Sequence, residues 1–151
     1  DLHLAASEAQ ARLTLRGRIV GDLNLSIPGE HNLINATAAV AAAVEVGASP
    51  SEVLSGIATF TGARRRFEIR GKANGITVVD DYGHHPTEIR ATLEVARLYA
   101  GSGRLFVIFQ PHRYSRTQAF ALDFAHELSK ADHVFLLEIY SAGEKIGRAH
   151  V

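Results

Sequence analysis

The sequence predicts an α/β fold in which a mostly parallel sheet flanked by helices follows part of a second α/β domain. Two continuous apolar runs, residues 105–109 and 134–137, are typical of strands buried on both faces, as in a parallel sheet. Helix-forming segments with apolar stripes stand between the strand-like segments. The composition, 46% hydrophobic and 21% charged over 151 residues, is ordinary for a globular protein and allows a sizeable core.

Half-buried strands are expected between Arg12 and Ile27. Leucine or isoleucine alternates there with aspartate, asparagine and serine, and this period of two places the apolar side chains on one face of a strand. Gly17 and Gly21 are expected to supply the turn chemistry between the strands.

Two helices are expected next. The alanine-rich segment "NLINATAAVAAAVEVG" has strong helix propensity, and Gly47 is suited to a left-handed C-terminal cap. In "SPSE", Ser49 is the expected N-cap, Pro50 the first helical residue and Glu52 the partner that completes a capping box. The second helix is expected to continue to about Ala58.

A domain boundary is expected at Gly62, where helical segments give way to a basic strand, so that residues 1–62 and 63–151 form separate domains. Beyond it the pattern predicts strand, strand, helix, strand, helix and strand, at residues 66–71, 75–81, 86–99, 104–109, about 117–130 and 133–139.

Composition argues against several classes of function. Sixteen basic and sixteen acidic residues give a formal net charge of zero, so no overall field favours a nucleic acid. With no cysteine, neither a disulfide framework nor a thiolate metal site is expected. No apolar run of about eighteen residues and no leader pattern is present, so no membrane partner is expected.

Two polar clusters follow predicted strands. "DDYGHHPTE", residues 80–88, comes after "ITVV", and "QPHRYSRT", residues 110–117, comes after "LFVIF". In open α/β sheets, ligands bind beyond the carboxyl ends of the strands, so both clusters are expected on the side of the sheet that binds ligand.

In the first cluster, Asp80 and Asp81 point in opposite directions if the strand continues, so one of them can face a ligand. Alternatively, Asp81 caps the helix that starts at Pro86. A metal site at His84 and His85 is disfavoured, because adjacent side chains diverge and zinc-ligand spacings are absent. These histidines are expected to bond a substrate or to be solvated.

In the second cluster, Arg113 and Arg116 stand three residues apart at a predicted helix entrance. Their planar guanidinium groups can converge on one anion, and a carboxylate suits them. The alternative is that both are solvated, as exposed arginines commonly are.

Three further features are weaker. His31, Asn32 and Asn35 could contact a heterocycle edge, although asparagine is also a common helix cap. The run from Arg64 to Arg66 could meet phosphate or belong to a solvated linker. The sequence has no G-x-x-x-x-G-K-[ST] stretch, so it carries no phosphate-binding loop of that kind.

Together, "GEHNLINATAAV", "FTGARRRFEIRG", "VVDDYGHHPTEIRATL", "FQPHRYSRT" and "EIYSAGE" resemble the later part of the Mur ligases. Within that family, the two polar clusters are most similar to the members that add L-alanine to UDP-N-acetylmuramate. The resemblance implies a bacterial cytoplasmic, ATP-dependent and Mg²⁺-dependent amide ligase of peptidoglycan synthesis, which works through an acyl phosphate.

The resemblance also implies roles for individual residues. Those that match the ATP site are His31, Asn32, Asn35, Arg66 and Asp81. Those that match the pocket of L-alanine are Tyr82, His84, Arg113 and Arg116. No residue of the chain is assigned a catalytic role, and none is assigned to a metal.

The departures from the family imply a fragment. The sugar-nucleotide domain, the phosphate loop and the Mg²⁺ ligands precede this region in the family. Residues 1–62 would then be the distal part of the central ATP-binding domain, and residues 63–151 a truncated Rossmann-like C-terminal domain. Alone, such a piece is expected to be inactive, because it lacks groups that stabilise a transferring phosphate. A non-catalytic nucleotide- or amino-acid-binding module is the alternative, and a histidine-based metallohydrolase is the third reading.

Overall fold

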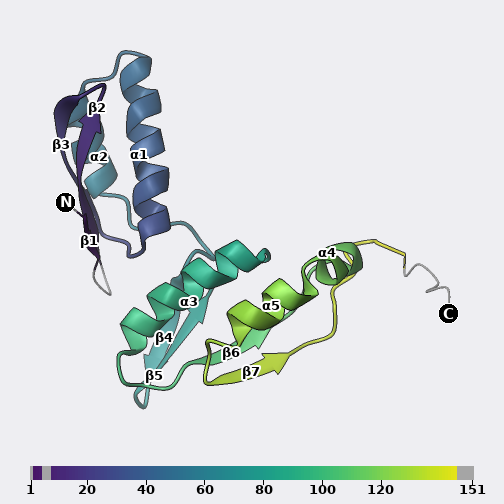
Figure 1. Ribbon diagram of the computed structural model, residues 1–151. Coiled ribbons are helices and arrows are strands. Elements are labelled where there is room, and N and C mark those ends of the chain that lie inside the picture. Colours follow the sequence, from purple (N-terminus) through teal and green to yellow (C-terminus); the bar gives the residue numbers. More distant parts are fainter. Residues whose placement is uncertain (1, 5–7, 146–151) are drawn as a thin grey trace. The chain divides into compact units, whose positions relative to one another are not determined.

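The computed structural model describes residues 2–4 and 8–145 (Figure 1). The chain forms two compact units, Asp1–Asp81 and Tyr82–Val151. The helices and strands are β1 (Leu2–Leu4), β2 (Ala9–Leu15), β3 (Arg18–Leu25), α1 (Glu30–Glu45), α2 (Pro50–Ala58), β4 (Glu68–Ala73), β5 (Ile76–Asp80), α3 (Pro86–Ala100), β6 (Phe106–Phe109), α4 (Tyr114–Ala119), α5 (Ala121–Leu128) and β7 (His133–Leu136).

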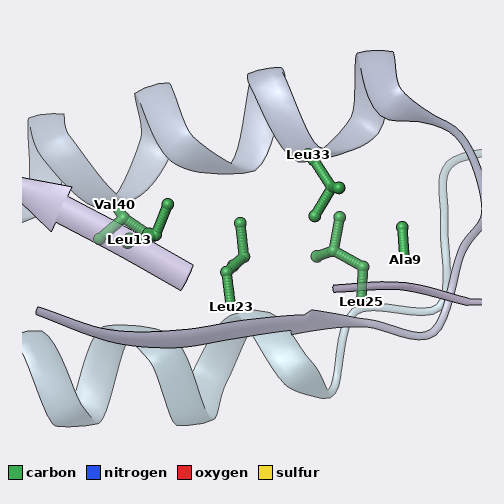
Figure 2. Close-up of a cluster of buried hydrophobic side chains, with 6 residues drawn as sticks. All are labelled: Ala9, Leu13, Leu23, Leu25, Leu33 and Val40. Atoms are coloured by element: carbon green, nitrogen blue, oxygen red, sulfur yellow. The ribbon is translucent and has the colours of Figure 1, made fainter. Parts of the chain in front are cut away.

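The first unit is built on an antiparallel sheet with strand order β1-β2-β3, against which α1 and α2 pack. The alternation expected between Arg12 and Ile27 is confirmed, because Leu13, Leu23 and Leu25 are buried. Together with Ala9 and two residues of α1, Leu33 and Val40, they form the core of this unit (Figure 2). Each fully buried leucine contributes roughly 1.5–3 kcal/mol of transfer free energy.

The turn between β2 and β3 uses Arg16 and Gly17, which both have positive φ, at 48° and 77°. A two-residue loop with positive φ at both positions matches the right-handed twist of the two strands that it connects in a hairpin. The expectation that Gly21 also serves the turn is wrong. Gly21 lies within β3, and a Cβ atom there would stand 2.7 Å from Leu54 Cδ1, so glycine allows α2 to approach the sheet closely.

The C-terminal cap expected for α1 is confirmed. Gly47 has φ of 98°, its N–H donates to Val44 O at 3.0 Å, and Ala48 N donates to Ala43 O at 3.0 Å. These two bonds make a Schellman motif, which satisfies carbonyl groups at the helix end.

Helix α2 starts at the residue that the sequence predicted, but the predicted hydrogen bonds at its N-terminus do not form. Ser49 is the N-cap and Pro50 begins the helix, as expected. The predicted capping box is wrong, because the Ser49 side chain makes no capping hydrogen bond. Its Oγ atom instead lies 3.0 Å from Ser51 Oγ, so the neighbouring hydroxyl takes the place of the backbone N–H.

An antiparallel hairpin, β4–β5, completes the first unit. Its turn contains Asn74 and Gly75, both with positive φ. The two compact units divide between Asp81 and Tyr82, so this hairpin groups with the first unit. The functional domain boundary after residue 62 stays a prediction.

In the second unit, α3 packs against α5, and α5 lies over the parallel pair β6–β7 (Figure 1). The expected helix from Pro86 is confirmed in α3. The core of the second unit is formed by Ile89 and Leu93 of α3, Phe109 of β6, and Phe124 and Leu128 of α5.

The single helix predicted at about residues 117–130 is wrong. Two helices, α4 and α5, stand there, and the backbone of Phe120 breaks them with φ of −117° and ψ of 21°. Phe120 N still donates to Arg116 O at 3.0 Å and Phe124 N to Phe120 O at 2.8 Å. The apolar stripe behind the prediction, Phe120, Phe124 and Leu128, begins at the break itself, so the pattern did not indicate where one helix ends and the next begins.

The described chain is therefore an α/β protein with small sheets. Among the described residues, its parallel strand pair is β6–β7, in register from Phe106 opposite His133 to Phe109 opposite Leu136, with one parallel bridge beyond the strands at His112 and Tyr140. The expectation that these strands are buried on both faces is wrong for the described residues. Phe106, Ile108, Phe135 and Leu136 remain 50%, 71%, 56% and 66% exposed.

Candidate functional site

The three residues expected near a heterocycle lie in the first turns of α1. Asn32 Nδ2 donates to Pro28 O at 2.7 Å, so this side chain stabilises the start of the helix. His31 is half-buried, and Asn35, one turn further along, is exposed. Neither asparagine is the helix cap, which is Gly29 without a side-chain capping bond, and Asn35 presents its amide on the surface of α1.

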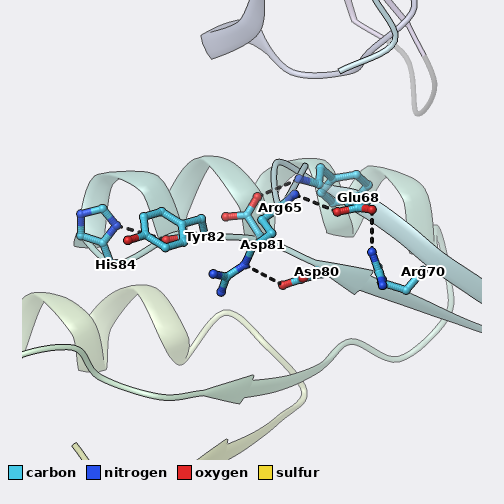
Figure 3. Close-up of polar contacts among 8 residues, drawn as sticks. Arg65, Glu68, Arg70, Asp80, Asp81, Tyr82 and His84 are labelled. Carbon is cyan, nitrogen blue, oxygen red and sulfur yellow. Dashed lines mark hydrogen bonds and ion pairs between the residues drawn. The ribbon is translucent and has the colours of Figure 1, made fainter. Parts of the chain in front are cut away.

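The basic run before β4 is a turn that Asp80 and Asp81 hold from β5. Asp81 Oδ2 accepts a hydrogen bond from Phe67 N at 2.9 Å, and Asp80 Oδ1 lies 3.7 Å from Arg65 Nε (Figure 3). Arg65 and Phe67 have positive φ, at 56° and 49°, which is unusual for residues with side chains. The two acids therefore act on different atoms of one turn, and Arg66 is exposed within it.

Glu68 orders the same turn, and sequence reasoning missed it. Its carboxylate accepts from Arg65 N at 2.9 Å and from Arg70 Nη1 at 2.7 Å (Figure 3). These hydrogen bonds lower the pKa of Glu68, that from the Arg65 backbone most strongly. An acid flanked by arginines on both sides in "RRRFEIR" was the available signal.

The first polar cluster continues into the second unit, where its two histidines have separate roles. His85 is the N-cap of α3, and its Nδ1 accepts from Thr87 N at 3.3 Å. Glu88 Oε2 accepts from His84 N at 2.9 Å and from His85 N at 3.2 Å, which completes a capping box. The cap that sequence reasoning offered to Asp81 belongs to His85.

The His84 ring contacts both Glu88 of that cap and Tyr82. Its Nδ1 lies 3.1 Å from Tyr82 O and 3.2 Å from Glu88 Oε2, and its ring meets the Tyr82 ring edge-on at 5.1 Å between centroids (Figure 3). Tyr82 and His84 therefore form one contacting pair.

The second polar cluster lies at the entrance to α4. Arg113 is the N-cap residue, has φ of 75°, and donates its backbone N–H to Tyr140 O at 2.8 Å. Its Nη1 lies 3.9 Å from Glu144 Oε1. The positive φ indicates that surrounding contacts fix this residue in an unfavourable conformation.

Arg116 is the most informative side chain of the cluster. Its Nη1 atom is buried, and no acceptor within the described ranges forms a hydrogen bond with it. A buried donor without a partner costs about 1–3 kcal/mol, and more when it is charged. Such an atom in a guanidinium group is well suited to an anionic ligand.

One aromatic contact links the end of the first cluster to the residue that follows α4. The His85 ring stands edge-on to the Phe120 ring with centroids 4.7 Å apart. The start of α3 and the junction of α4 with α5 are therefore adjacent.

A metal centre is not supported by the part of the chain that the structure covers. Among residues 2–4 and 8–145, no three histidine, aspartate or glutamate side chains are grouped closely enough to hold a metal ion. Within those same ranges, no helix combines the length and apolar character that crossing a membrane requires.

The fold is that of an α/β protein, and each of the two polar clusters follows the end of a strand. The chain belongs to the Mur ligase family, because the pattern described as Mur ligase, glutamate ligase domain matches residues 65–150.

Curated relatives agree with that assignment. The chain is 52% identical over 141 residues to a UDP-N-acetylmuramate--L-alanine ligase of Kineococcus radiotolerans, covering 93% of this chain and 30% of the relative. It is 56% identical over 126 residues to the ligase of the same name from Mycobacterium marinum, covering 82% of this chain and 26% of the relative. The chain thus spans less than a third of these relatives.

Solved structures show the same fold. The UDP-N-acetylmuramate-alanine ligase of Thermotoga maritima matches with a TM-score of 0.80 and 34% identity, over 95% of this chain and 32% of that one. A MurF structure from Acinetobacter baumannii matches with a TM-score of 0.69 and 26% identity, over 90% of this chain and 30% of that one.

Proposed function

We propose that this chain is part of a longer ATP-dependent ligase that joins L-alanine to UDP-N-acetylmuramate in peptidoglycan synthesis. The names of the relatives support the activity, and the 30% of the Kineococcus protein that the chain spans supports the larger size. The observation that carries the amino-acid site is the buried, unpartnered Nη1 atom of Arg116. The complete ligase would work in the cytoplasm.

The proposed reaction forms one amide bond. ATP transfers its terminal phosphoryl group to the carboxylate of UDP-N-acetylmuramate, and the α-amine of L-alanine attacks the resulting acyl phosphate. The tetrahedral intermediate then expels phosphate, so ATP becomes ADP and phosphate while the amine loses its protons to solvent or a base. The contribution of this chain is to bind and orient substrates.

The second unit would hold the amino acid. Arg116 can donate to the carboxylate of L-alanine through the nitrogen that has no partner within the described ranges. We assign Arg113, Tyr82 and His84 to the surroundings of the same ligand. The contact of His85 with Phe120, the residue that follows α4, supports this assignment, since it brings the end of the first cluster near the helix that carries Arg116.

The first unit would contribute to the nucleotide site. The exposed Asn35 amide and the half-buried His31 ring are suited to a heterocycle, with Asn32 fixing the start of their helix. Arg66 lies on a turn held by Asp81, a residue we assign to the ribose.

Mg²⁺ would accompany ATP in the complete ligase. The described residues do not form a set of ligands for it, so we place its ligands elsewhere in the longer protein. We also propose that in the complete ligase β6 and β7 belong to a Rossmann-like, mostly parallel sheet. Their parallel register and the match to the Thermotoga structure support this view.

The test is a chimera in which these 151 residues replace the matching segment of the Kineococcus ligase. Arg116→Ala should raise the KM for L-alanine on the order of a hundredfold, because it removes a charge-assisted contact of roughly 2–3 kcal/mol. Arg116→Lys should recover only part, since an ammonium group cannot form the planar fork. The KM for ATP should change little in both variants.

Arg90→Ala is the matched control, because Arg90 is an exposed arginine of α3 in the same unit. A large rise in the KM for ATP with an unchanged value for L-alanine would contradict the assignment of the second cluster. An inactive chimera, together with ATP or L-alanine binding by the chain itself, would favour the non-catalytic binding module.

A further inference from the structure

The loops after β6 and β7 run alongside each other beyond the strands. Arg113 N donates to Tyr140 O and Tyr140 N donates to Pro111 O, both at 2.8 Å, around a parallel bridge between His112 and Tyr140. The parallel pairing therefore continues past the strand ends into the segment that carries the second cluster. The loop after β7 is thereby fixed beside the entrance to α4.

Glu144 comes from that second loop, and both of its carboxylate oxygens bind Ser115. Oε1 accepts from Ser115 Oγ at 2.6 Å, and Oε2 accepts from Ser115 N at 3.0 Å. A turn leads into Glu144, closed by a hydrogen bond from the backbone N–H of Glu144 to Ser141 O at 3.0 Å. The Glu144 side chain is 24% exposed and Ser115 is an exposed residue, so this contact lies at the surface.

Glu144 also distinguishes the two arginines of the second cluster. Arg113 Nη1 lies 3.9 Å from Glu144 Oε1, whereas the buried Nη1 of Arg116 has no hydrogen-bond acceptor in the described part of the chain. The carboxylate of Glu144 thus stands beside the guanidinium group of Arg113 and offsets its charge. The positive charge of Arg116 is left for a ligand from outside.

The hydrogen bonds to Ser115 act on the same arginine through the backbone. Ser115 directly precedes Arg116, and Arg116 O accepts from Phe120 N at 3.0 Å at the end of the short helix α4. Since α4 has only six residues, fixing its first turn fixes the direction in which the Arg116 side chain leaves the backbone.

We propose that Glu144 is a positioning residue, which holds Ser115 and Arg113 so that Arg116 is directed toward the carboxylate of the amino-acid substrate. This inference rests on the proposed function, because it takes the amino acid to be the ligand of Arg116. Glu144 itself does not touch the substrate in this arrangement.

The kinetic test uses the chimera with the Kineococcus ligase. Glu144→Ala should raise the KM for L-alanine by about tenfold, the size expected when charge-assisted hydrogen bonds that orient a ligand are removed. The values of kcat and of the KM for ATP should stay within about twofold. Glu144→Gln should fall between, because its amide keeps one acceptor oxygen but neither the second acceptor nor the charge.

Glu138→Ala is the control for kinetics, since Glu138 is an exposed acid of the same loop. Equal rises in the two KM values of Glu144→Ala would overturn the proposal, because they would indicate a general structural defect. An unchanged KM for L-alanine would overturn it as well.

A second measurement on the 151-residue chain needs no activity. Hydrogen exchange of the Ser115 amide, followed by NMR, should be at least about tenfold faster in Glu144→Ala than in the unaltered chain and unchanged in Glu138→Ala. Equal exchange rates would overturn the positioning role by themselves. If the unaltered chimera fails to ligate L-alanine, the proposed function fails, and faster exchange in Glu144→Ala would still support the hold of Glu144 on α4.

Discussion

At the scale of single residues, His85 joins two parts of the second unit. Its Nδ1 caps α3 through Thr87 N, and its ring contacts Phe120 at the break between α4 and α5. One side chain therefore stabilises both the start of a helix and the packing of that start on a neighbouring segment.

We predict that His85→Ala lowers the free energy of unfolding of the second unit by about 1–2 kcal/mol, through loss of the cap and of the aromatic contact. His85→Asp should recover the part that belongs to the cap. Urea unfolding followed by circular dichroism measures both values. His126→Ala, on the exposed surface of α5, is the control. No difference between His85→Ala and this control would contradict the role.

The sequence indicated the divergence of His84 and His85 but not which of the two serves the helix. Adjacent side chains on a helix or strand diverge, so the pattern disfavoured a shared metal. It could not tell that Glu88 would reach back to the N–H groups of both histidines, because that bond depends on the three-dimensional path of the loop. Glu144 was missed for the same reason, since 29 residues separate it from Ser115.

At the scale of helices and strands, the close approach of α2 to the first sheet depends on Gly21. We predict that Gly21→Ala destabilises the first unit by about 1–3 kcal/mol, because the added Cβ would stand 2.7 Å from Leu54 Cδ1 and something must shift. Thermal unfolding is the measurement.

Gly71→Ala in β4 is the control, since nothing lies within 4 Å of its added Cβ. Introducing Gly21→Ala into a chain that already carries Leu54→Ala should cost less than in the unaltered chain, as coupling between neighbours requires. An equal cost in both backgrounds would show that backbone strain, and not the contact with Leu54, sets the effect.

Element positions were predictable where local chemistry decides them. α3 begins at Pro86 as expected and α1 ends before Gly47, because proline and glycine restrict or permit particular backbone angles. The break at Phe120 and the place of Gly21 inside β3 depend on contacts between elements, which periodicity does not record. The sequence predicted parallel strands here, and β6 and β7 do pair in parallel. It also predicted that both faces of these strands are buried, but in the described residues several of their apolar side chains are exposed.

At the scale of the whole molecule, carboxylates with lowered pKa values occur in both compact units. They are Asp22 and Glu68 in the first unit and Asp132 and Glu144 in the second. Hydrogen bonds are the largest cause in each, given respectively by Arg12, the Arg65 backbone, the Leu105 backbone and the Ser115 hydroxyl. Each of these groups is therefore more acidic folded than unfolded.

We predict that acid destabilises both units. A carboxylate with a lowered folded pKa contributes fully above its unfolded pKa, about 4, and this contribution is lost as the pH falls through the folded value. Thermal unfolding should show a Tm that is steady from about pH 7 to 5 and falls below about pH 4.

Asp132→Asn separates this effect from general acid unfolding. Asp132 Oδ2 accepts from Leu105 N at 2.6 Å and lies 3.1 Å from Arg97 Nη1. The substitution should lower the Tm near pH 7 and make the fall below about pH 4 shallower. A parallel shift of the whole curve, with the same fall in acid, would show that Asp132 does not contribute to the pH dependence.

The exposed face of β6 and β7 also determines how the second unit responds to temperature. Phe106, Ile108, Phe135 and Leu136 are already half or more in contact with water when the unit is folded. The heat-capacity increase on unfolding arises mainly from newly hydrated apolar surface. Unfolding exposes only the remaining surface of these four side chains, so each adds only part of its possible contribution to the heat-capacity increase. The curve of stability against temperature for this unit is therefore flatter than its content of large apolar residues would suggest.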